Sequence, residues 1–390
     1  MTSRHRRRRR RIVTSAAAAA VATAGVLYYT CGGDGYIYGD MGSTFSSASA
    51  STTTSSASST SIRQLHVIQE NGGLHGQFDP NAPPPMLSSA DTDGKPRLRH
   101  LYQGGRWGNI LFQWASTYAI AKANDMMPCL VENRDRSLPL HMYFEDSSQF
   151  PICEGVHDAD AREEPTWDGG FRAAWRFFKV GDSSSTSTTY YERNGHTGED
   201  VNLKGFMESA SNLADVEEEV VKMFTFREKY RREGEEYMDP IREEGYTPVG
   251  IHARRGDKSK QCCQPQYFQD AMANITNTLR ERGEDREIMW LVASQLPDGP
   301  DWYAEMKSLG VFPEENTRYI GKSTVADFNI LTQTDHIIVT HGTFSFFAGY
   351  LGAWQKRREG GIVIQPSTMK ELSVGLDWTT IDGCLPPTEK

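Results

Sequence analysis

The strongest constraint on the fold is the regular alternation of short apolar runs with longer helical segments in the second half of the chain. Apolar runs of this length indicate strands buried on both faces, and the segments between them have helical periodicity. Strands are expected at 248–253, 288–293, 318–320, 336–340 and 361–365. Helices are expected at 265–281, 302–309, 324–333 and 344–355. This order predicts a parallel, doubly wound α/β sheet, whose ligands bind beyond the carboxyl ends of its strands.

A second α/β unit is expected earlier in the chain. Its elements would be a strand at 98–102, a glycine-containing loop at 104–108, a helix at 109–123 and a strand at 128–132. Two charged helices, at 216–224 and 226–244, would connect this unit to the later sheet. The chain has 390 residues, which exceeds the usual single-domain size of about 100 to 200 residues. Two lobes are therefore predicted, an amino-terminal lobe at 98–245 and a ligand-binding lobe at 246–390.

The amino terminus has the pattern of a membrane anchor. Residues 1–11 include seven Arg, and residues 12–29 contain no charged side chain. A helix needs about 20 apolar residues to cross a bilayer, and a basic flank stays in the cytosol. We expect a cytosolic tail at 1–11 and a signal-anchor helix at 12–29 in type II orientation. A cleaved signal peptide and an Arg-rich transit peptide are the alternatives.

The segment at 30–97 is rich in Ser, Thr, Gly and Pro. Such a composition cannot bury enough apolar surface to order itself, so a disordered stem is predicted. Deleting the chain before about Arg97 should then leave the rest of the chain, called the body below, folded and active.

Charge and cysteine content exclude several classes of protein. The net charge is −9 although seven basic residues lie in the terminal tail, so the remaining chain is strongly acidic and unsuited to nucleic-acid binding. The six cysteines form no CxxC pair, which indicates neither a zinc site nor a redox motif but permits a few disulfides. One glycosylation sequon begins at Asn274.

The segment at 249–257 carries the best candidate chemistry. An apolar strand there ends in His252, Arg254, Arg255 and Asp257. Guanidinium groups bind phosphate oxygens through paired hydrogen bonds, so a diphosphate site is one interpretation. Two surface arginines paired with Asp257 would be the other.

Two further segments follow predicted strands. Residues 104–109 place glycines and Asn109 at a helix start, which suits either an anion or sugar site or a simple helix cap. Residues 340–347 place hydroxyl and aromatic side chains after the strand at 336–340. Two DxD pairs, Asp91 with Asp93 and Asp158 with Asp160, have the spacing of metal-dependent glycosyltransferases. The first lies in the expected stem and the second follows no apolar strand, so no metal site is predicted.

Together and in this order, these segments resemble the α1,2-fucosyltransferases of glycosyltransferase family 11. The likeness extends from about Leu101 to Pro366. Residues 105–119 resemble the family's GRxGNQ segment, residues 252–257 its HxRRGD motif, and residues 340–351 its TxGTFGFWxAYL motif. Ile110, His341 and Gly349 depart from the usual residues.

The resemblance implies a GT-B-like fold with two Rossmann-type lobes, placed in the Golgi lumen behind the anchor and stem. It implies inverting, metal-independent transfer of L-fucose from GDP-fucose to the 2-hydroxyl of a galactose-terminated glycan, with no cofactor. The resemblance implies catalytic roles for Arg254 and Asn109, and Asp257 is the candidate for the general base. Donor binding is implied for His252, Arg254, Arg255, Ser294, Asp327, Thr343, Ser345 and Phe346. Fucosyl transfer to core N-glycans or to protein hydroxyls, and a catalytically silent glycan- or nucleotide-binding protein, are the alternative functions.

Overall fold

The structure is a computed structural model of the chain. It describes residues 86–101, 105–132, 140–157, 166–168, 200–255, 263–294, 299–357 and 360–384. All of these residues belong to one compact unit, Gly32–Lys390. The predicted anchor at 12–29 and the pair Asp158 and Asp160 lie outside the described residues. Within the part that the structure describes, no helix is both long enough and apolar enough to cross a membrane.

The first sheet is parallel, with strand order β1-β4-β3-β2-β6-β5. Its strands are β1 (Met86–Leu87), β2 (Arg97–Leu101), β3 (Met127–Glu132), β4 (Ile152–His157), β5 (Thr166–Asp168) and β6 (Val201–Lys204). Helix α1 (Trp107–Ala123) packs on β2 and β3. The predicted strand, loop, helix and strand at 98–132 are thereby confirmed.

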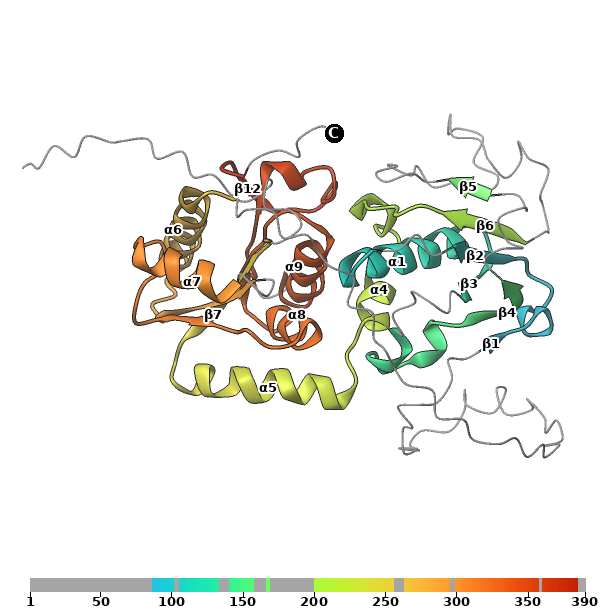
Figure 1. The fold of residues 1–390 in the computed structure, drawn as a ribbon, viewed down its shortest axis with the longest axis horizontal. Helices are drawn as coiled ribbons and strands as arrows, with labels where there is room; N and C mark the ends of the chain where they lie inside the picture. Colours follow the sequence, from blue (N-terminus) through green and yellow to red (C-terminus); the bar gives the residue numbers. More distant parts are fainter. Residues whose placement is uncertain are drawn as a thin grey trace, which may run out of the picture. The chain divides into compact units, whose positions relative to one another are not determined.

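The second sheet is also parallel, with order β12-β11-β10-β7-β8-β9. Its strands are β7 (Thr247–Ala253), β8 (Ile288–Ser294), β9 (Thr317–Tyr319), β10 (His336–Ile338), β11 (Val363–Pro366) and β12 (Thr379–Ile381). Its helices are α6 (Pro265–Glu281), α7 (Gly299–Ser308), α8 (Thr324–Thr332) and α9 (Thr343–Arg357). Figure 1 shows α6 and α7 on one face of this sheet and α8 and α9 on the other. The doubly wound arrangement expected from the sequence is confirmed.

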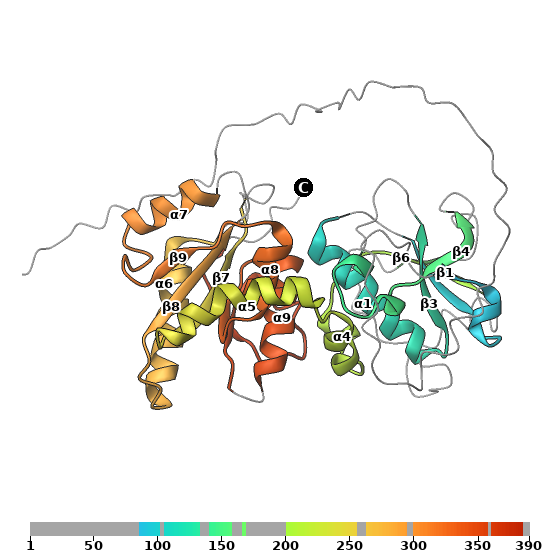
Figure 2. The same ribbon diagram turned by 90° about the horizontal axis from the view of Figure 1, so that it is seen from below.

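Helices connect the two sheets into one core. Helices α4 (Glu217–Met223) and α5 (Glu228–Glu243) follow the first sheet, and α5 runs beside α8 (Figure 2). Helix α1 packs against α9, where the ring of Phe112 lies 4.6 Å from that of Phe346. Short 3-10 helices lie at Ser89–Thr92, Leu140–Met142, Ser147–Gln149, Ala210–Asn212 and Ser367–Met369. The carboxyl ends of the second sheet's strands therefore face the start of α1.

Gly108 lets α1 approach α9 this closely. A Cβ atom on Gly108 would collide with the backbone of Thr343 and Phe344 at the start of α9. Any larger residue would push the two helix starts apart. Gly108, in the first turn of α1, is thus required by packing between the two sheets' helices.

The predicted boundary of the stem, at residue 97, is wrong, because the folded part already begins at Met86. Strand β1 and a 3-10 helix lie within the predicted stem, and Leu87 is buried beside Leu101, Cys129, Val131 and Cys153. A strand of two residues is too short to show alternation in the sequence, which explains the error. Asp91 accepts hydrogen bonds from the backbone and hydroxyl of Ser88, so its carboxylate caps a turn.

Two disulfides are present among the described residues. Cys129 on β3 is bonded to Cys153 on β4, and Cys263 before α6 is bonded to Cys384 near the carboxyl terminus. Structural disulfides were permitted by the sequence, but their pairing was not predicted.

Candidate active site

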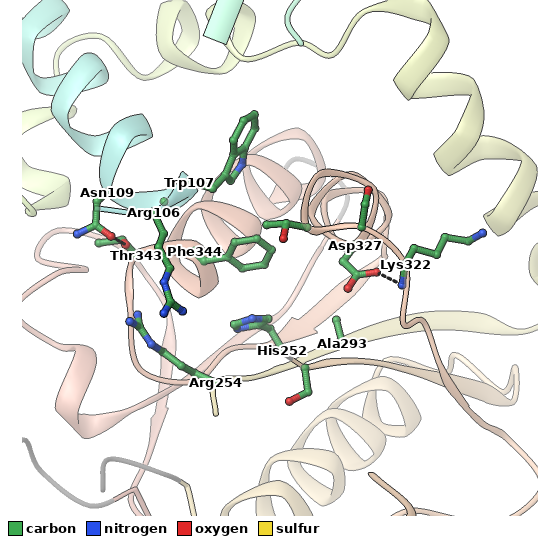
Figure 3. A pocket seen from close by; sticks show the side chains of 14 residues that line it. Arg106, Trp107, Asn109, His252, Arg254, Ala293, Lys322, Asp327, Thr343 and Phe344 are labelled. Carbon is green, nitrogen blue, oxygen red and sulfur yellow. Dashed lines mark hydrogen bonds between the residues drawn. The ribbon is translucent and has the colours of Figure 1, made fainter. Parts of the chain in front are cut away.

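A cavity of about 560 Å³ opens where strands β7 and β8 end and helices α1, α8 and α9 begin (Figure 3). This volume is within the range of pockets that bind small molecules, about 300 to 1,000 Å³. The lining combines basic, aromatic and hydroxyl side chains. It consists of Arg106, Trp107, Gly108, Asn109, His252, Arg254, Ala293, Ser294, Lys322, Ser323, Thr324, Asp327, Thr343 and Phe344.

Arg254 enters the cavity directly beyond β7. Its backbone N–H donates to Oγ1 of Thr340, at 2.8 Å, which ties the strand end to the segment after β10. Gly342 has a φ of 117°, and a Cβ atom there would collide with the Arg254 guanidinium. A glycine is therefore needed at this position both for its left-handed backbone and for the space that Arg254 occupies.

A second guanidinium reaches the same place from the other sheet. Figure 3 shows the side chains of Arg106, which precedes α1, and Arg254 extending toward one another in the cavity. Two planar guanidinium groups in one partly enclosed space form a site suited to an anion with several oxygens, such as a diphosphate.

His252 lies beside Arg254 and is neutral. Burial, and to a lesser degree the positive charge of Arg254, lowers the pKa of His252 to about 3. Its Nδ1 is hydrogen-bonded to Oγ of Ser345, and its ring lies 4.6 Å from that of Phe344. A histidine with this pKa is a neutral imidazole at neutral pH, which keeps one ring N–H as a hydrogen-bond donor but is neither a useful acid nor a strong base.

Asn109 and Thr343 join the two halves of the cavity. The hydroxyl of Thr343 donates to Oδ1 of Asn109 at 3.0 Å, and Nδ2 of Asn109 donates to Oε1 of Glu208 at 2.7 Å. Asn109 belongs to α1 and Thr343 begins α9. These bonds fix both polar side chains at the end of the cavity that contains Arg106.

The opposite end of the cavity is formed by the start of α8. Oγ of Ser323 accepts from the N–H of Ala326, and Oδ1 of Asp327 accepts from the N–H of Lys322 at 2.8 Å. Burial raises the pKa of Asp327 to about 6, although the hydrogen bond and charge of Lys322 oppose this. Asp327 can thus present a carboxylate to hydrogen-bond donors of a ligand above about pH 6.

Most of the predicted site residues meet in this cavity. Asn109, His252, Arg254, Ser294, Asp327 and Thr343 line it. Ser294 donates its hydroxyl to the carbonyl of Ala253 at 2.9 Å, which also holds the ends of β7 and β8 together. Ser345 is fully buried and is linked to the cavity through His252.

Two predicted donor contacts lie elsewhere. Phe346 is fully buried and packs against Phe112, because it follows the lining residue Phe344 by two positions, about 200° around the helix. The Arg255 guanidinium lies over the ring of Trp302, 5.7 Å from its centroid, because successive residues of extended chain face opposite sides. Neither residue lines the cavity.

Of the two remaining predicted residues, the structure describes Asn274 but not Asp257. Asp257 lies outside the described residues, so its role as a base stays a prediction. Asn274 lies in α6 and is half-exposed.

Several lining residues were not predicted from the sequence. Arg106, Trp107 and Phe344 lie inside segments that were recognised, but they were given no role. Lys322, Ser323 and Thr324 follow β9 and begin α8. The rule that ligands bind beyond strand ends would have identified this segment. Among the residues that the structure describes, no group of three or more His, Cys, Asp and Glu could hold a metal ion.

Comparisons with known proteins agree on one family. The model of glycosyl transferase family 11 matches residues 184–371. The galactoside alpha-(1,2)-fucosyltransferase 2 of Bos taurus is 25% identical over 311 residues, which are 75% of this chain and 81% of the relative. The protein of the same name from Mus musculus is 28% identical over 260 residues, 63% of this chain and 66% of the relative.

A solved structure, the fucosyltransferase NodZ from Bradyrhizobium, is 14% identical with a TM-score of 0.36, and the match covers 65% of this chain and 92% of that protein.

Proposed function

Because this chain belongs to glycosyl transferase family 11, we propose that it transfers L-fucose from GDP-fucose to the 2-hydroxyl of a terminal galactose. Fucosyl transfer is the activity that the curated relatives have in their names, and the α1,2 linkage comes from the same names. The observation that carries the proposal is the pair of guanidinium groups, Arg106 and Arg254, in a cavity at the carboxyl end of a doubly wound sheet. A GT-B-like division into two lobes, the first extended to include β1 and the second at 246–390, is part of this proposal.

The geometry supports a donor that lies along the cavity. The diphosphate would bind Arg254 and Arg106, with the positive end of the α9 dipole close by. The nucleoside would extend toward Asp327 and Ser294, whose side chains lie at the ends of α8 and β8. The fucose would then lie near Asn109 and Thr343, on the side of the cavity that α1 forms.

In the proposed reaction the bond between fucose C1 and the β-phosphate oxygen breaks, and the galactose 2-hydroxyl attacks C1 from the opposite face. Negative charge grows on the departing diphosphate, and fixed guanidinium donors stabilise it most in the transition state. His252 is neutral beside Arg254, so it has no imidazolium proton to transfer to the leaving group. The two arginines would therefore neutralise the diphosphate without a proton and without a metal ion. Asp257 stays our candidate for the base that accepts the galactose proton.

Product analysis tests this function. The purified body is incubated with GDP-fucose and a panel of galactose-terminated glycans in excess EDTA, and the linkage of each product is determined. We expect fucose on the 2-hydroxyl of galactose. Fucose on a core N-glycan or on a protein hydroxyl would assign a different fucosyltransferase class, and loss of activity that Mn²⁺ restores would contradict the metal-free mechanism.

We also propose that the protein is a single-pass type II membrane protein of the Golgi, with its body in the lumen and Asn274 glycosylated. The proposal rests on the Arg-rich tail, the uncharged segment at 12–29 and the sequon. In intact microsomes, protease should leave the carboxyl-terminal body undigested. Complete digestion without detergent would place the body in the cytosol and contradict this topology.

A further inference from the structure

The carboxylate of Glu208 lies outside the cavity lining, yet it is hydrogen-bonded to a residue inside it. We propose that Glu208 is a positioning residue, which orients Asn109 and Thr343 so that the Thr343 hydroxyl accepts a hydrogen bond from the fucose of the donor. This inference rests on the proposed function, because it names the part of GDP-fucose that this end of the cavity binds. It changes the role of Thr343, which the sequence assigned to donor binding without distinguishing sugar from phosphate.

The first step is the orientation of the Asn109 amide. Glu208 Oε1 accepts from Asn109 Nδ2 at 2.7 Å, and Thr343 Oγ1 donates to Asn109 Oδ1 at 3.0 Å. Only the amide nitrogen can donate to a carboxylate, so the amide oxygen must face Thr343. Glu208 is 6% exposed and Thr343 is 4% exposed, so water competes little for either bond. The carboxylate thus settles which way the amide points.

The second step concerns the proton of Thr343. A threonine hydroxyl has one proton and two lone pairs. Its proton is used in the bond to Asn109, so only its lone pairs are available to a ligand in the cavity. The ionised oxygens of a diphosphate are acceptors and cannot bond to another acceptor. Sugar hydroxyl groups can donate, which makes the fucose the part of GDP-fucose that fits Thr343.

The backbone before Glu208 shows that the fold maintains this arrangement. Met207 has a φ of 49°, in the left-handed region, although it is not a glycine. Its carbonyl accepts from the hydroxyl of Ser116, the amide of Asn212 and the N–H of Ser209. Backbone outliers of this kind persist where surrounding contacts enforce them and are common at functional sites. Three donors on one carbonyl fix the turn from which the Glu208 side chain extends.

Binding measurements separate the sugar from the diphosphate. The affinities of the full chain for GDP and for GDP-fucose are measured by calorimetry without an acceptor. The variants are Glu208→Ala, Thr343→Val and the double variant, with Glu208→Gln as the conservative change. Glu284→Ala is the matched control, because it removes the same charge from an exposed turn.

We expect Glu208→Ala and Thr343→Val each to weaken GDP-fucose binding by about threefold to tenfold, the range for loss of one hydrogen bond, with little change in GDP binding. The double variant should bind GDP-fucose no more weakly than the worse single variant, because both changes break the same chain of bonds. Glu208→Gln should regain part of the affinity, because its amide oxygen can still accept from Asn109. Glu284→Ala should match the parent.

The possible failures are distinguishable. A parent protein that binds neither GDP nor GDP-fucose would reject the proposed function, and this inference with it. A parent that binds both, with variants that lose GDP and GDP-fucose affinity in parallel, would reject only the role of Glu208. Additive losses of GDP-fucose affinity in the double variant would also reject only the role of Glu208. Should Glu208→Ala fail to fold, Glu208→Gln carries the test of Glu208, and unchanged GDP-fucose affinity in Glu208→Gln together with unchanged affinity in Thr343→Val would reject the inference.

Discussion

Arg254 and Arg255 are consecutive in the chain but have different surroundings. Arg254 lines the cavity, whereas the Arg255 guanidinium lies over the ring of Trp302 on α7. A guanidinium offers two parallel N–H donors to a phosphate, and the single ammonium of lysine cannot reproduce them. A lysine substitution keeps the positive charge at either position. Only at position 254 would it also lose the orientation of a bound diphosphate.

We therefore predict that Arg254→Lys lowers turnover by about a hundredfold or more, the cost of removing one charge-stabilising donor from such a site. Arg255→Lys should have a milder effect, because that side chain lies away from the cavity. Steady-state turnover and GDP affinity of both variants beside the parent protein test this. Near-parental turnover in Arg254→Lys together with loss of activity in Arg255→Lys would reverse our assignment of the phosphate contact.

Single residues in the site differ in how well the sequence could identify them. His252 and Arg254 lie at the end of a strand that its apolar run makes visible, so their place at a carboxyl strand end was predictable. Phe346 is a hydrophobic residue in a recognised motif, and only the rotation of α9 decides that it packs in the core. Helical periodicity in this segment is ambiguous because most side chains from Phe344 to Trp354 are apolar or small, so no single face stands out.

At the scale of elements, strand β1 sets the amino-terminal limit of the folded body. Met86 and Leu87 pair with Ile152 and Cys153 of β4, and Leu87 is 8% exposed. Ten residues later, the Arg97 side chain at the start of β2 pairs with Asp200 at 2.6 Å. A body that begins beyond Arg97 would lose the edge strand and this ion pair.

We predict that a soluble form beginning at Met86 folds and retains fucosyl transfer, whereas one beginning at Leu98 is less stable. Burial of one leucine contributes about 2 kcal/mol, and the lost strand pairing adds to this. Thermal melting of the two forms under the same conditions measures the difference. Equal melting temperatures would show that β1 contributes nothing to the stability of the body.

The order of elements was more predictable than their contacts with one another. Strands β7 to β11 and helices α6 to α9 were predicted to within a few residues, because each of these strands is an apolar run separated from the next by a helix of ordinary length. Strand β12, at the edge of the same sheet, was not predicted. Asn109 and Thr343 are 234 positions apart, and no local pattern shows that they share a hydrogen bond. Glu208 was missed for the same reason, since its partner is 99 positions away.

At the scale of the whole molecule, the cavity depends on how the two sheets are arranged. Two parallel sheets bring the start of α1 and the end of β7 to the same cavity, so that each contributes an arginine. The donor site would then be complete only when both are present, because each sheet and its helices supply only one of the two guanidinium groups. We therefore expect GDP to contact both Arg106, before α1, and Arg254, after β7.

The most direct test is a crystal structure of the body with GDP bound. We predict that the β-phosphate lies within hydrogen-bond distance of the Arg254 guanidinium, with Arg106 also in contact with the diphosphate and the guanine side toward Asp327. A nucleotide that binds elsewhere, or in this cavity with its diphosphate away from Arg254, would contradict the account.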